Sequence, residues 1–412
     1  MCENIVNIWI VNPYGTLPSE GWREYRSAQL ARALAARGHR VTWWIGDFEH
    51  RSKAYRTPVN YDPLLPASVE IRCLPTPSYQ RHIGSGRIRF EQAFGRRFTA
   101  EATKADRPDV IVLAEPSLFF GVPVRRFAAE RKIPLVIDVI DLWPELFHIL
   151  LPGPLKRLGK LVFAPLYSRR RKLARQAAGI AAVTGDYRDT VAAGFKDKPT
   201  GIFYWGVDFA SFQKQYPALP PLHETAGWNA EFVGATLVYA GTLGEAYDIT
   251  TACQAARLLC ERNAPVRFVF AGDGPLRPTV EQLACDYPDR VYFAGSVSPD
   301  QLVPLYQQSD IGLCSYAPGS TVSMPIKIFD YLAAGLAVLS SLGGEISQIV
   351  KSGIGLQYEA GSADALADAI ARLAGDPAKL VEMKNRSGGL GEKFDNQRQY
   401  GAFAEFIETA AA

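Results

Sequence analysis

Histidine, cysteine and methionine are scarce in this chain of 412 residues, which contains 5, 6 and 3 of them respectively. The cysteines, at positions 2, 73, 253, 260, 285 and 314, show neither a C-x-x-C motif nor the spacing of a zinc site. They also form no disulfide framework, so we expect reduced thiols in apolar surroundings. The sequence therefore predicts no metal site and no cofactor.

Long hydrophobic runs and an excess of one charge are missing too. No stretch of about 18 apolar residues is present, so no membrane-spanning helix is predicted. The first residues are typical of a β-strand and lack the basic and apolar regions of a signal peptide. The 45 basic and 42 acidic residues give a formal charge of +3, which is too small to indicate a nucleic-acid partner. We expect a cytoplasmic protein that does not bind nucleic acid.

A complete dinucleotide fingerprint, G-x-G-x-x-G, is also missing. Residues 237–244 and 266–275 are β-branched and aromatic runs that end at closely spaced glycines, but neither has the third glycine. An NAD-dependent dehydrogenase is therefore disfavoured. Glycine at the carboxyl end of a parallel strand still lets a nucleotide approach the backbone, so we expect such contacts at Gly241 and Gly272.

Predicted strands and helices alternate along the chain, which indicates an α/β fold. The length suits two domains of ordinary size. We predict two doubly wound, Rossmann-like domains that face each other across a cleft. The predicted parts are an N-terminal domain over 1–207, a proline-rich linker over 208–232, a nucleotide-binding domain over 233–392 and a C-terminal helix over 393–412. That helix has Tyr400, Phe403 and Ile407 on one face, suited to packing back on the first domain.

The most informative motif is a short amphipathic segment over residues 323–335. Ser323 suits a helix N-cap, Pro325 suits the first turn and Gly335 suits the end. Lys327 and Asp330 are three residues apart and share a helix face. A lysine at the positive end of a helix suits the phosphates of a nucleoside diphosphate, and the carboxylate one turn later suits its ribose. A capped surface helix with a Lys–Asp pair is the alternative interpretation.

Several motifs together resemble a known family. They are Tyr-Ala-Gly-Thr-Leu-Gly at 239–244, Ala-Gly-Asp-Gly-Pro at 271–275, Met-Pro-Ile-Lys-Ile-Phe-Asp-Tyr-Leu-Ala-Ala-Gly at 324–335, Asn-Pro-Tyr-Gly-Thr at 12–16 and Asp-Leu-Trp-Pro-Glu at 141–145. With these motifs the chain resembles the retaining glycosyltransferases of family four, which have the GT-B fold. The resemblance is nearest to the bacterial branch that builds O-antigen, capsule or exopolysaccharide. It implies a nucleotide-sugar donor, in particular a UDP-sugar with or without an N-acetyl group, and a lipid-linked or saccharide acceptor.

The chain also departs from that family. Two acidic residues usually lie eight positions apart; the second position holds Asp330 here, but the first holds Val322. An arginine usually follows the glycine that corresponds to Gly241, and Thr242 takes its place. Since the usual phosphate cations are missing, Lys327 is the expected replacement, because a diphosphate leaves poorly without a cation.

The resemblance implies metal-independent transfer with retention, in which the protein positions groups and stabilises leaving-group charge. Lys327, Asp141 and Glu145 are the expected catalytic residues, although the two acids could instead cap the helix that Pro144 starts. The residues expected at the donor are Gly15, Thr16, Gly241, Thr242, Gly272, Asp273, Gly295, Ser296, Val297, Ser323, Pro325, Ile326 and Asp330.

Acceptor contacts are predicted from two segments. Glu20, Arg23 and Arg26 open a predicted helix where an acceptor phosphate could bind, although a solvated helix start is an equal alternative. His82 lies in a predicted loop that could close on substrate or be an ordinary surface loop.

The segment 155–175 mixes basic and apolar residues. It suits an anionic membrane surface on the inner face of the plasma membrane, and equally an ordinary packed helix with a basic face.

Two other function classes stay open. A nucleotide-sugar epimerase of the same fold would need acids or bases placed for proton abstraction, and few histidines lie near the strand ends. A non-catalytic nucleotide-sugar-binding protein would account for the missing family cations. Release of nucleoside diphosphate that depends on an acceptor separates all three classes.

Overall fold

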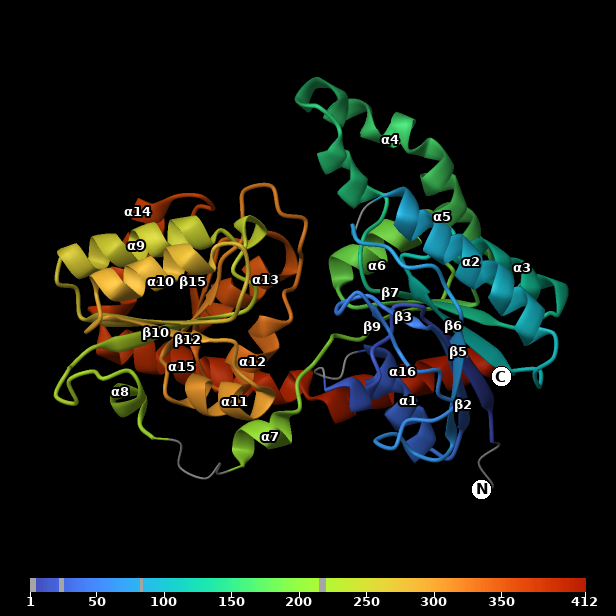
Figure 1. Ribbon diagram of the computed structural model, residues 1–412, viewed down its shortest axis with the longest axis horizontal. Coiled ribbons are helices and arrows are strands. Elements are labelled where there is room, and N and C mark those ends of the chain that lie inside the picture. Colours follow the sequence, from blue (N-terminus) through green and yellow to red (C-terminus); the bar gives the residue numbers. More distant parts are fainter. Residues whose placement is uncertain (1–4, 22–25, 82–83, 215–219) are drawn as a thin grey trace. The chain divides into compact units, whose positions relative to one another are not determined.

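The computed structural model describes residues 5–21, 26–81, 84–214 and 220–412 of the chain (Figure 1). Two compact units are present. Unit 1 comprises Met1–Trp205 together with Gln397–Ala412, and unit 2 comprises Gly206–Asn396.

Unit 1 is built on a seven-stranded parallel sheet with the order β5-β2-β1-β6-β7-β8-β9. Its central strands are buried on both faces, which explains their nearly continuous apolar sequences. The strands are β1 (Asn7–Val11), β2 (Arg40–Gly46), β5 (Val69–Leu74), β6 (Val110–Glu115), β7 (Leu135–Val139), β8 (Gly179–Ala182) and β9 (Thr200–Ile202), with a separate antiparallel pair β3 (Phe48–Glu49) and β4 (Ala54–Tyr55).

Helices cover both faces of this sheet (Figure 1). One face carries α1 (Arg26–Ala36) and α16 (Asn396–Ala411). The other carries α2 (Ser85–Ala102), α3 (Gly121–Glu130), α5 (Ala164–Gln176) and α6 (Gly185–Ala192). Before α5, the short helices η2 (Glu145–Leu150), η3 (Gly153–Leu158) and α4 (Gly159–Val162) extend away from the sheet.

Aromatic side chains fill the two cores of unit 1. On one face the ring centroids of Trp9 and Trp44 lie 5.0 Å apart, and Phe127 stacks on Trp9 at 5.8 Å. On the other face Phe403 of α16 stacks on Phe203 at 4.7 Å. Tyr400 and Ile407 of α16 are buried in the same core, so this C-terminal helix completes unit 1.

Unit 2 is built on a six-stranded parallel sheet with the order β12-β11-β10-β13-β14-β15. Its strands are β10 (Ala235–Ala240), β11 (Val266–Ala271), β12 (Val291–Gly295), β13 (Ile311–Cys314), β14 (Ala337–Ser340) and β15 (Gly355–Gln357). Both units therefore have parallel sheets between helical layers, which confirms the predicted α/β, Rossmann-like fold class.

Helices also cover both faces of the sheet of unit 2 (Figure 1). One face carries α9 (Ile249–Glu261), α10 (Arg277–Asp286) and α14 (Ala363–Ala374), and the other carries α11 (Pro299–Gln307), α12 (Lys327–Ala333) and α15 (Pro377–Gly391). The short helix α13 (Gly344–Ile349) follows β14. Side-chain caps begin two of the helices: Ser362 accepts from the N–H of Ala365 before α14, and Asp376 accepts from that of Lys379 before α15.

The proline-rich stretch expected to be a linker belongs to unit 2. It carries the short helices α7 (Phe209–Gln213) and α8 (Leu222–Thr225). Phe212 and Trp228 are buried, and the indole N–H of Trp228 donates to the carbonyl of Pro288 at 3.1 Å. The described part of this stretch therefore has two buried aromatic side chains in unit 2, and its role as a linker stays a prediction.

None of the helices within the described ranges is both long enough and apolar enough to span a bilayer.

Candidate active site

The strand order of unit 2 reverses beside β10. The chain runs from β10 to β11 and β12 on one side, then returns to β13 and β14 on the other. The neighbouring strands β10 and β13 pair directly, with Leu237 opposite Ile311. In doubly wound folds, ligands bind at the carboxyl ends of strands where the order reverses. The residues that follow β10 and β13 are therefore the first to consider.

Backbone hydrogen bonds from two glycines connect the carboxyl ends of β10, β11 and β12. The N–H of Gly241 donates to the carbonyl of Ala271 at 2.9 Å, and the N–H of Gly272 donates to the carbonyl of Gly295 at 2.7 Å. Gly241 and Gly272 have φ angles of +147° and +137°, which favour glycine. A Cβ on Gly272 would also overlap the carbonyl of Gly241. The backbone at these strand ends therefore packs closely and carries no side chain of its own at Gly241 and Gly272.

Lys327, the first residue of α12, lies next to this glycine edge. A Cβ at Gly241 would lie 3.2 Å from the Nζ of Lys327. Part of the lysine side chain is exposed, but its Nζ is buried and makes no hydrogen bond within the described part of the chain. Burial lowers the pKa of Lys327 to about 8, against the smaller opposing effects of Cys314 and Asp330. A buried amine without a hydrogen-bond acceptor at a strand-order switch is poised to bind an anion.

Three tyrosines surround the amine of Lys327, and the sequence analysis missed them. The Nζ lies 3.9 Å from the ring centroid of Tyr239, 5.4 Å from that of Tyr247 and 5.7 Å from that of Tyr316. Aromatic faces stabilise a cation without neutralising it. Only Tyr239 could have been predicted near the site from the sequence. It lies two residues before Gly241, and residues two apart in a strand lie on the same face.

The predicted start of the helix over 323–335 is wrong. The helix α12 begins at Lys327, with Ile326 as N-cap and no side-chain cap. Ser323 instead connects to α13: its hydroxyl accepts from the N–H of Glu345 at 3.4 Å, and its carbonyl accepts from that of Ile346 at 3.2 Å. This tertiary contact replaces the local capping that the sequence pattern indicates.

The other donor residues of unit 2 differ in accessibility. Asp330 is only 3% exposed and is not free of partners, so its expected contact with ribose remains a prediction. Thr242, Asp273 and Ser296 are exposed, whereas Asp330 is buried. Pro325 is buried and Ile326 and Val297 are partly buried. Asp273 accepts from the N–H of Gly274 at 2.8 Å, so part of its carboxylate is already used.

Gly15 and Thr16, also expected at the donor, lie in unit 1. They follow β1, where the order of this sheet also reverses, between β1 and β6. Any Cβ on Gly15 would overlap the indole of Trp43, so glycine is required there by packing. The carbonyl of Gly15 accepts from the Nη2 of Arg56 at 3.1 Å.

Asp141 has its carboxylate held close to the end of β7. It accepts from the N–H of Leu142 at 2.8 Å and from the Nε1 of Trp143 at 3.0 Å. Burial raises its pKa, although these bonds and Arg87 oppose the shift. The guanidinium of Arg87 lies 4.1 Å from the ring centroid of Trp143 and 4.5 Å from that of Tyr14. Asp141 therefore has a rigid setting beside a cation, and its role as a sugar or acceptor contact stays a prediction.

Glu145 forms a salt bridge with Arg170. Its two carboxylate oxygens accept from Arg170 at 2.5 and 2.6 Å, and Arg170 also donates to the carbonyl of Trp143 at 2.8 Å. Neither acid caps η2, whose N-cap, Pro144, has no side-chain cap bond. This bidentate pair connects η2 to α5, and a catalytic role for Glu145 stays a prediction.

Arg26 and Glu20 are likewise committed to internal contacts. Arg26 is buried and forms a salt bridge to Asp138 at 2.7 Å, and it also donates to the carbonyls of Phe203 and Tyr204. Glu20 forms a salt bridge to Arg56 at 2.7 Å. Both side chains therefore have internal partners, and their expected contacts with an acceptor stay predictions.

Two further acceptor predictions are not addressed by the structure: Arg23 and His82 lie outside the described residues. Within the described ranges, no cluster of three or more His, Cys, Asp and Glu side chains could hold a metal ion.

Comparison with known proteins gives each unit a family. Residues 24–199 match the family "Glycosyl transferase 4-like domain", and residues 234–376 match the family "Glycosyl transferases group 1". The chain is 32% identical over 96 residues to the gpi3 subunit of phosphatidylinositol N-acetylglucosaminyltransferase of Schizosaccharomyces pombe. That alignment covers 23% of this chain, which spans only 20% of the length of that relative.

Solved structures resemble the whole chain. HepE of Anabaena, determined in complex with UDP, has a TM-score of 0.66 at 14% identity and covers 98% of this chain and 100% of its own. Sucrose-phosphate synthase of Thermosynechococcus elongatus has a TM-score of 0.71 at 16% identity and covers 98% of both chains. Because a glycosyltransferase family matches each of the two units, and the fold is shared with these structures, the chain belongs to the glycosyltransferases of the GT-B fold.

Proposed function

We propose that the protein transfers a sugar from a UDP-sugar to a lipid-linked saccharide acceptor, with retention of configuration and without a metal ion. The proposed setting is the synthesis of a bacterial cell-surface polysaccharide, which rests on the motifs at 141–145 and 324–335. The buried amine of Lys327 carries the proposal, because it lies at the strand-order switch of unit 2 with no hydrogen-bond acceptor.

The chemistry proposed for this amine follows from charge. When a sugar leaves a nucleoside diphosphate, negative charge develops on the leaving phosphate oxygen. An ammonium held in a buried position stabilises that charge more strongly than one in water. Gly241 and Gly272 have no side chains of their own, which favours a close approach of a diphosphate to the backbone near Lys327. Lys327 would thus replace the arginine whose family position Thr242 occupies.

A UDP donor and a lipid-linked acceptor have separate support. HepE was determined with UDP, and the gpi3 relative is named for transfer to phosphatidylinositol. In this chain, four apolar side chains of η3 and α4 are exposed: Leu155 by 44%, Leu158 by 48%, Leu161 by 74% and Val162 by 51%. Together with the neighbouring basic residues, they form a surface suited to a membrane interface, where a lipid-linked acceptor would be reached.

Binding of UDP tests the donor site. UDP should raise the melting temperature of the wild-type protein, since a ligand that binds only the folded state stabilises it. Lys327→Met should remove most of that increase, whereas Lys351→Met, a change at an exposed lysine of the same unit, should not. Equal stabilisation of all three proteins by UDP would contradict the proposed role of Lys327.

Turnover tests the reaction. We expect free UDP to be released from a UDP-sugar only when a saccharide acceptor is added, and the linkage formed to keep the donor's anomeric configuration. Conversion of the sugar without an acceptor would indicate an epimerase. Binding without any conversion across a panel of UDP-sugars and lipid-linked acceptors would indicate a non-catalytic binding protein.

A further inference from the structure

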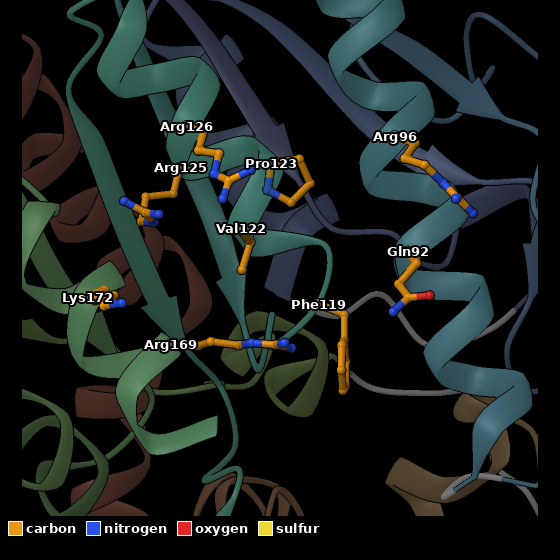
Figure 2. Close-up of a pocket in the computed structure, with 9 residues that line it drawn as sticks. All are labelled: Gln92, Arg96, Phe119, Val122, Pro123, Arg125, Arg126, Arg169 and Lys172. Carbon is orange, nitrogen blue, oxygen red and sulfur yellow. The ribbon is translucent and has the colours of Figure 1, made fainter. Parts of the chain in front are cut away.

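A groove on unit 1 is lined by five basic side chains and an apolar wall. Its volume is about 640 Å³, and all its lining residues come from α2, α3, α5 and the turn before α3 (Figure 2). The basic residues are Arg96, Arg125, Arg126, Arg169 and Lys172, and the others are Gln92, Phe119, Val122 and Pro123. The size is in the range of small-molecule sites, which are about 300–1,000 Å³.

The five cations of the groove have no acidic counterparts. None of them forms a salt bridge within the described part of the chain. Their hydrogen bonds within the described residues go to neutral groups: Arg125 donates to the side chain of Gln176, and Arg169 donates to the carbonyl of Leu118. Burial and the neighbouring charge of Arg126 lower the pKa of Arg125. Positive charge is therefore gathered here without neutralisation.

The cations come from three different helices and line the same groove. Figure 2 shows Arg96 and Gln92 on α2, Arg125 and Arg126 on α3, and Arg169 and Lys172 on α5. The guanidinium of Arg169 lies 5.0 Å from the ring centroid of Phe119, which holds it at one end of the groove. Five cationic side chains that line one groove raise the positive potential there, which favours a bound anion.

We propose that this groove binds a phosphate-bearing ligand, either a soluble phosphate or diphosphate compound or the phosphate headgroup of a lipid. Arginine suits phosphate because its planar guanidinium donates two parallel hydrogen bonds. The groove is larger than one phosphate needs, and Phe119, Val122 and Pro123 provide an apolar wall for the rest of the ligand. This site lies wholly in unit 1 and is distinct from the Lys327 site in unit 2, so it goes beyond the proposed function.

A pair of double variants tests the site with equal changes of charge. Arg96 and Lys172 line the groove, whereas Arg97 and Arg171 are exposed, lie one position away on the same helices and do not line it. Arg96→Gln with Lys172→Gln should weaken binding of inorganic pyrophosphate at least about tenfold, which calorimetry would measure in the presence of saturating UDP. Arg97→Gln with Arg171→Gln should leave it within about twofold.

The second arm uses vesicles of phosphatidylcholine with and without phosphatidylglycerol. Loss of pyrophosphate binding in the groove variant alone supports a soluble ligand. If the protein binds only the phosphatidylglycerol vesicles, and the groove variant loses this binding while the control keeps it, the ligand is a lipid headgroup.

Two outcomes would overturn the proposal. In one, both double variants weaken binding equally, so that only general positive charge matters. In the other, the wild-type protein binds neither pyrophosphate nor the vesicles. Both results are independent of the proposed function, which fails instead if UDP stabilisation does not depend on Lys327.

Discussion

The two units differ in whether buried charged side chains near the carboxyl ends of their strands are paired. In unit 1, Arg26 pairs with Asp138 at 2.7 Å and Arg170 pairs with Glu145 at 2.5 Å. In unit 2, the buried Nζ of Lys327 has aromatic neighbours but no hydrogen-bond partner in the described ranges. A paired buried charge is explained by the structure alone. An unpaired one costs folding free energy, so its presence indicates a ligand.

Unit 1 also has buried charged groups that lack a hydrogen-bond partner within the described residues: the Nζ of Lys53 and one oxygen of Glu115. Glu115, at the end of β6, is buried and accepts from the N–H of Ser117 at 2.9 Å through one oxygen, while its Oε1 has no partner in the described part of the chain. Burial raises the pKa of Glu115 to about 7, despite the opposing bonds from Ser117. Near neutral pH this carboxyl is therefore partly protonated.

The largest expected effect is the loss of the buried pair in unit 1. Asp138→Asn would leave Arg26 buried without its counter-charge, which typically costs about 3–5 kcal/mol in the free energy of unfolding. Denaturant unfolding would measure the loss. Asp189→Asn is the control, because Asp189 is an exposed partner of Arg188 and such pairs contribute about 0–1 kcal/mol. Similar losses in both variants would break the distinction between structural and surface pairs.

Glu115→Gln tests whether the buried carboxyl of Glu115 titrates near neutral pH. The raised pKa of Glu115 means that its stabilising effect is full below the unfolded value of 4.5 and is lost as pH rises through about 7. Glutamine carries no charge, so the variant should be more stable than wild type above pH 7 by up to about 3 kcal/mol, and similar to it at acidic pH. Urea unfolding at several pH values measures this. Parallel pH profiles for the two proteins would show that Glu115 does not titrate as described.

Lys327 should give a weaker, pH-dependent effect on ligand binding. Its pKa of about 8 in the free protein means that the amine loses its charge as pH rises through that value. Affinity for UDP should fall by up to about tenfold per pH unit above about pH 8, because the charged form is the one that binds phosphate. Lys327→Ala should lower turnover by more than about tenfold and leave the fold intact.

Calorimetric titration of UDP at several pH values gives the measurement. The Lys327→Ala protein is the control for the wild-type protein, because its remaining affinity for UDP should not change across this pH range. Turnover close to wild type in Lys327→Ala, or an affinity that is flat with pH in the wild-type protein, would contradict the assignment.

Membrane binding should respond to apolar side chains more than to the basic face of α5 as a whole. Arg170 is buried and paired with Glu145, so it is not available to lipid. Leu158→Ser with Leu161→Ser should weaken sedimentation with anionic vesicles, since each buried methylene contributes about 0.8 kcal/mol. The exposed Val381→Ser in unit 2 is the control. Vesicle binding that is unchanged in the double variant would favour an ordinary packed segment and a soluble acceptor.

The smallest expected effect is that of a chelator, which should leave turnover unchanged. An ammonium would neutralise the leaving group in place of a divalent cation. Assays with excess EDTA, with and without added magnesium or manganese, would check this. Activity that is lost in EDTA and restored by either metal would contradict the proposal and direct attention to Asp138 and Asp141.

Strand positions were well predicted from the sequence, but helix starts and charge pairs were not. Continuous apolar runs at 135–139 and 337–340 predict buried parallel strands and match β7 and β14 at both ends. The run at 69–74 also predicts a strand and matches β5, an edge strand in which buried and exposed residues alternate. The short strand β15 and the antiparallel pair β3 and β4 were not predicted, since two or three residues carry no periodic signal.

The sequence alone determined the alternating α/β order and the glycines at the strand ends, because both follow from local conformation and burial. Only the tertiary structure decided which charged residues are available for chemistry. Arg26 and Asp138 are 112 positions apart, and Glu145 and Arg170 are 25 apart, so their pairing has no local signature. Ser323 and Lys327 show the same limit: each suits a helix start, but tertiary contacts bind the first to α13 and leave the second without a hydrogen-bond partner in the described ranges. Local sequence sets backbone preference, whereas burial and partnership depend on which segments the fold brings together.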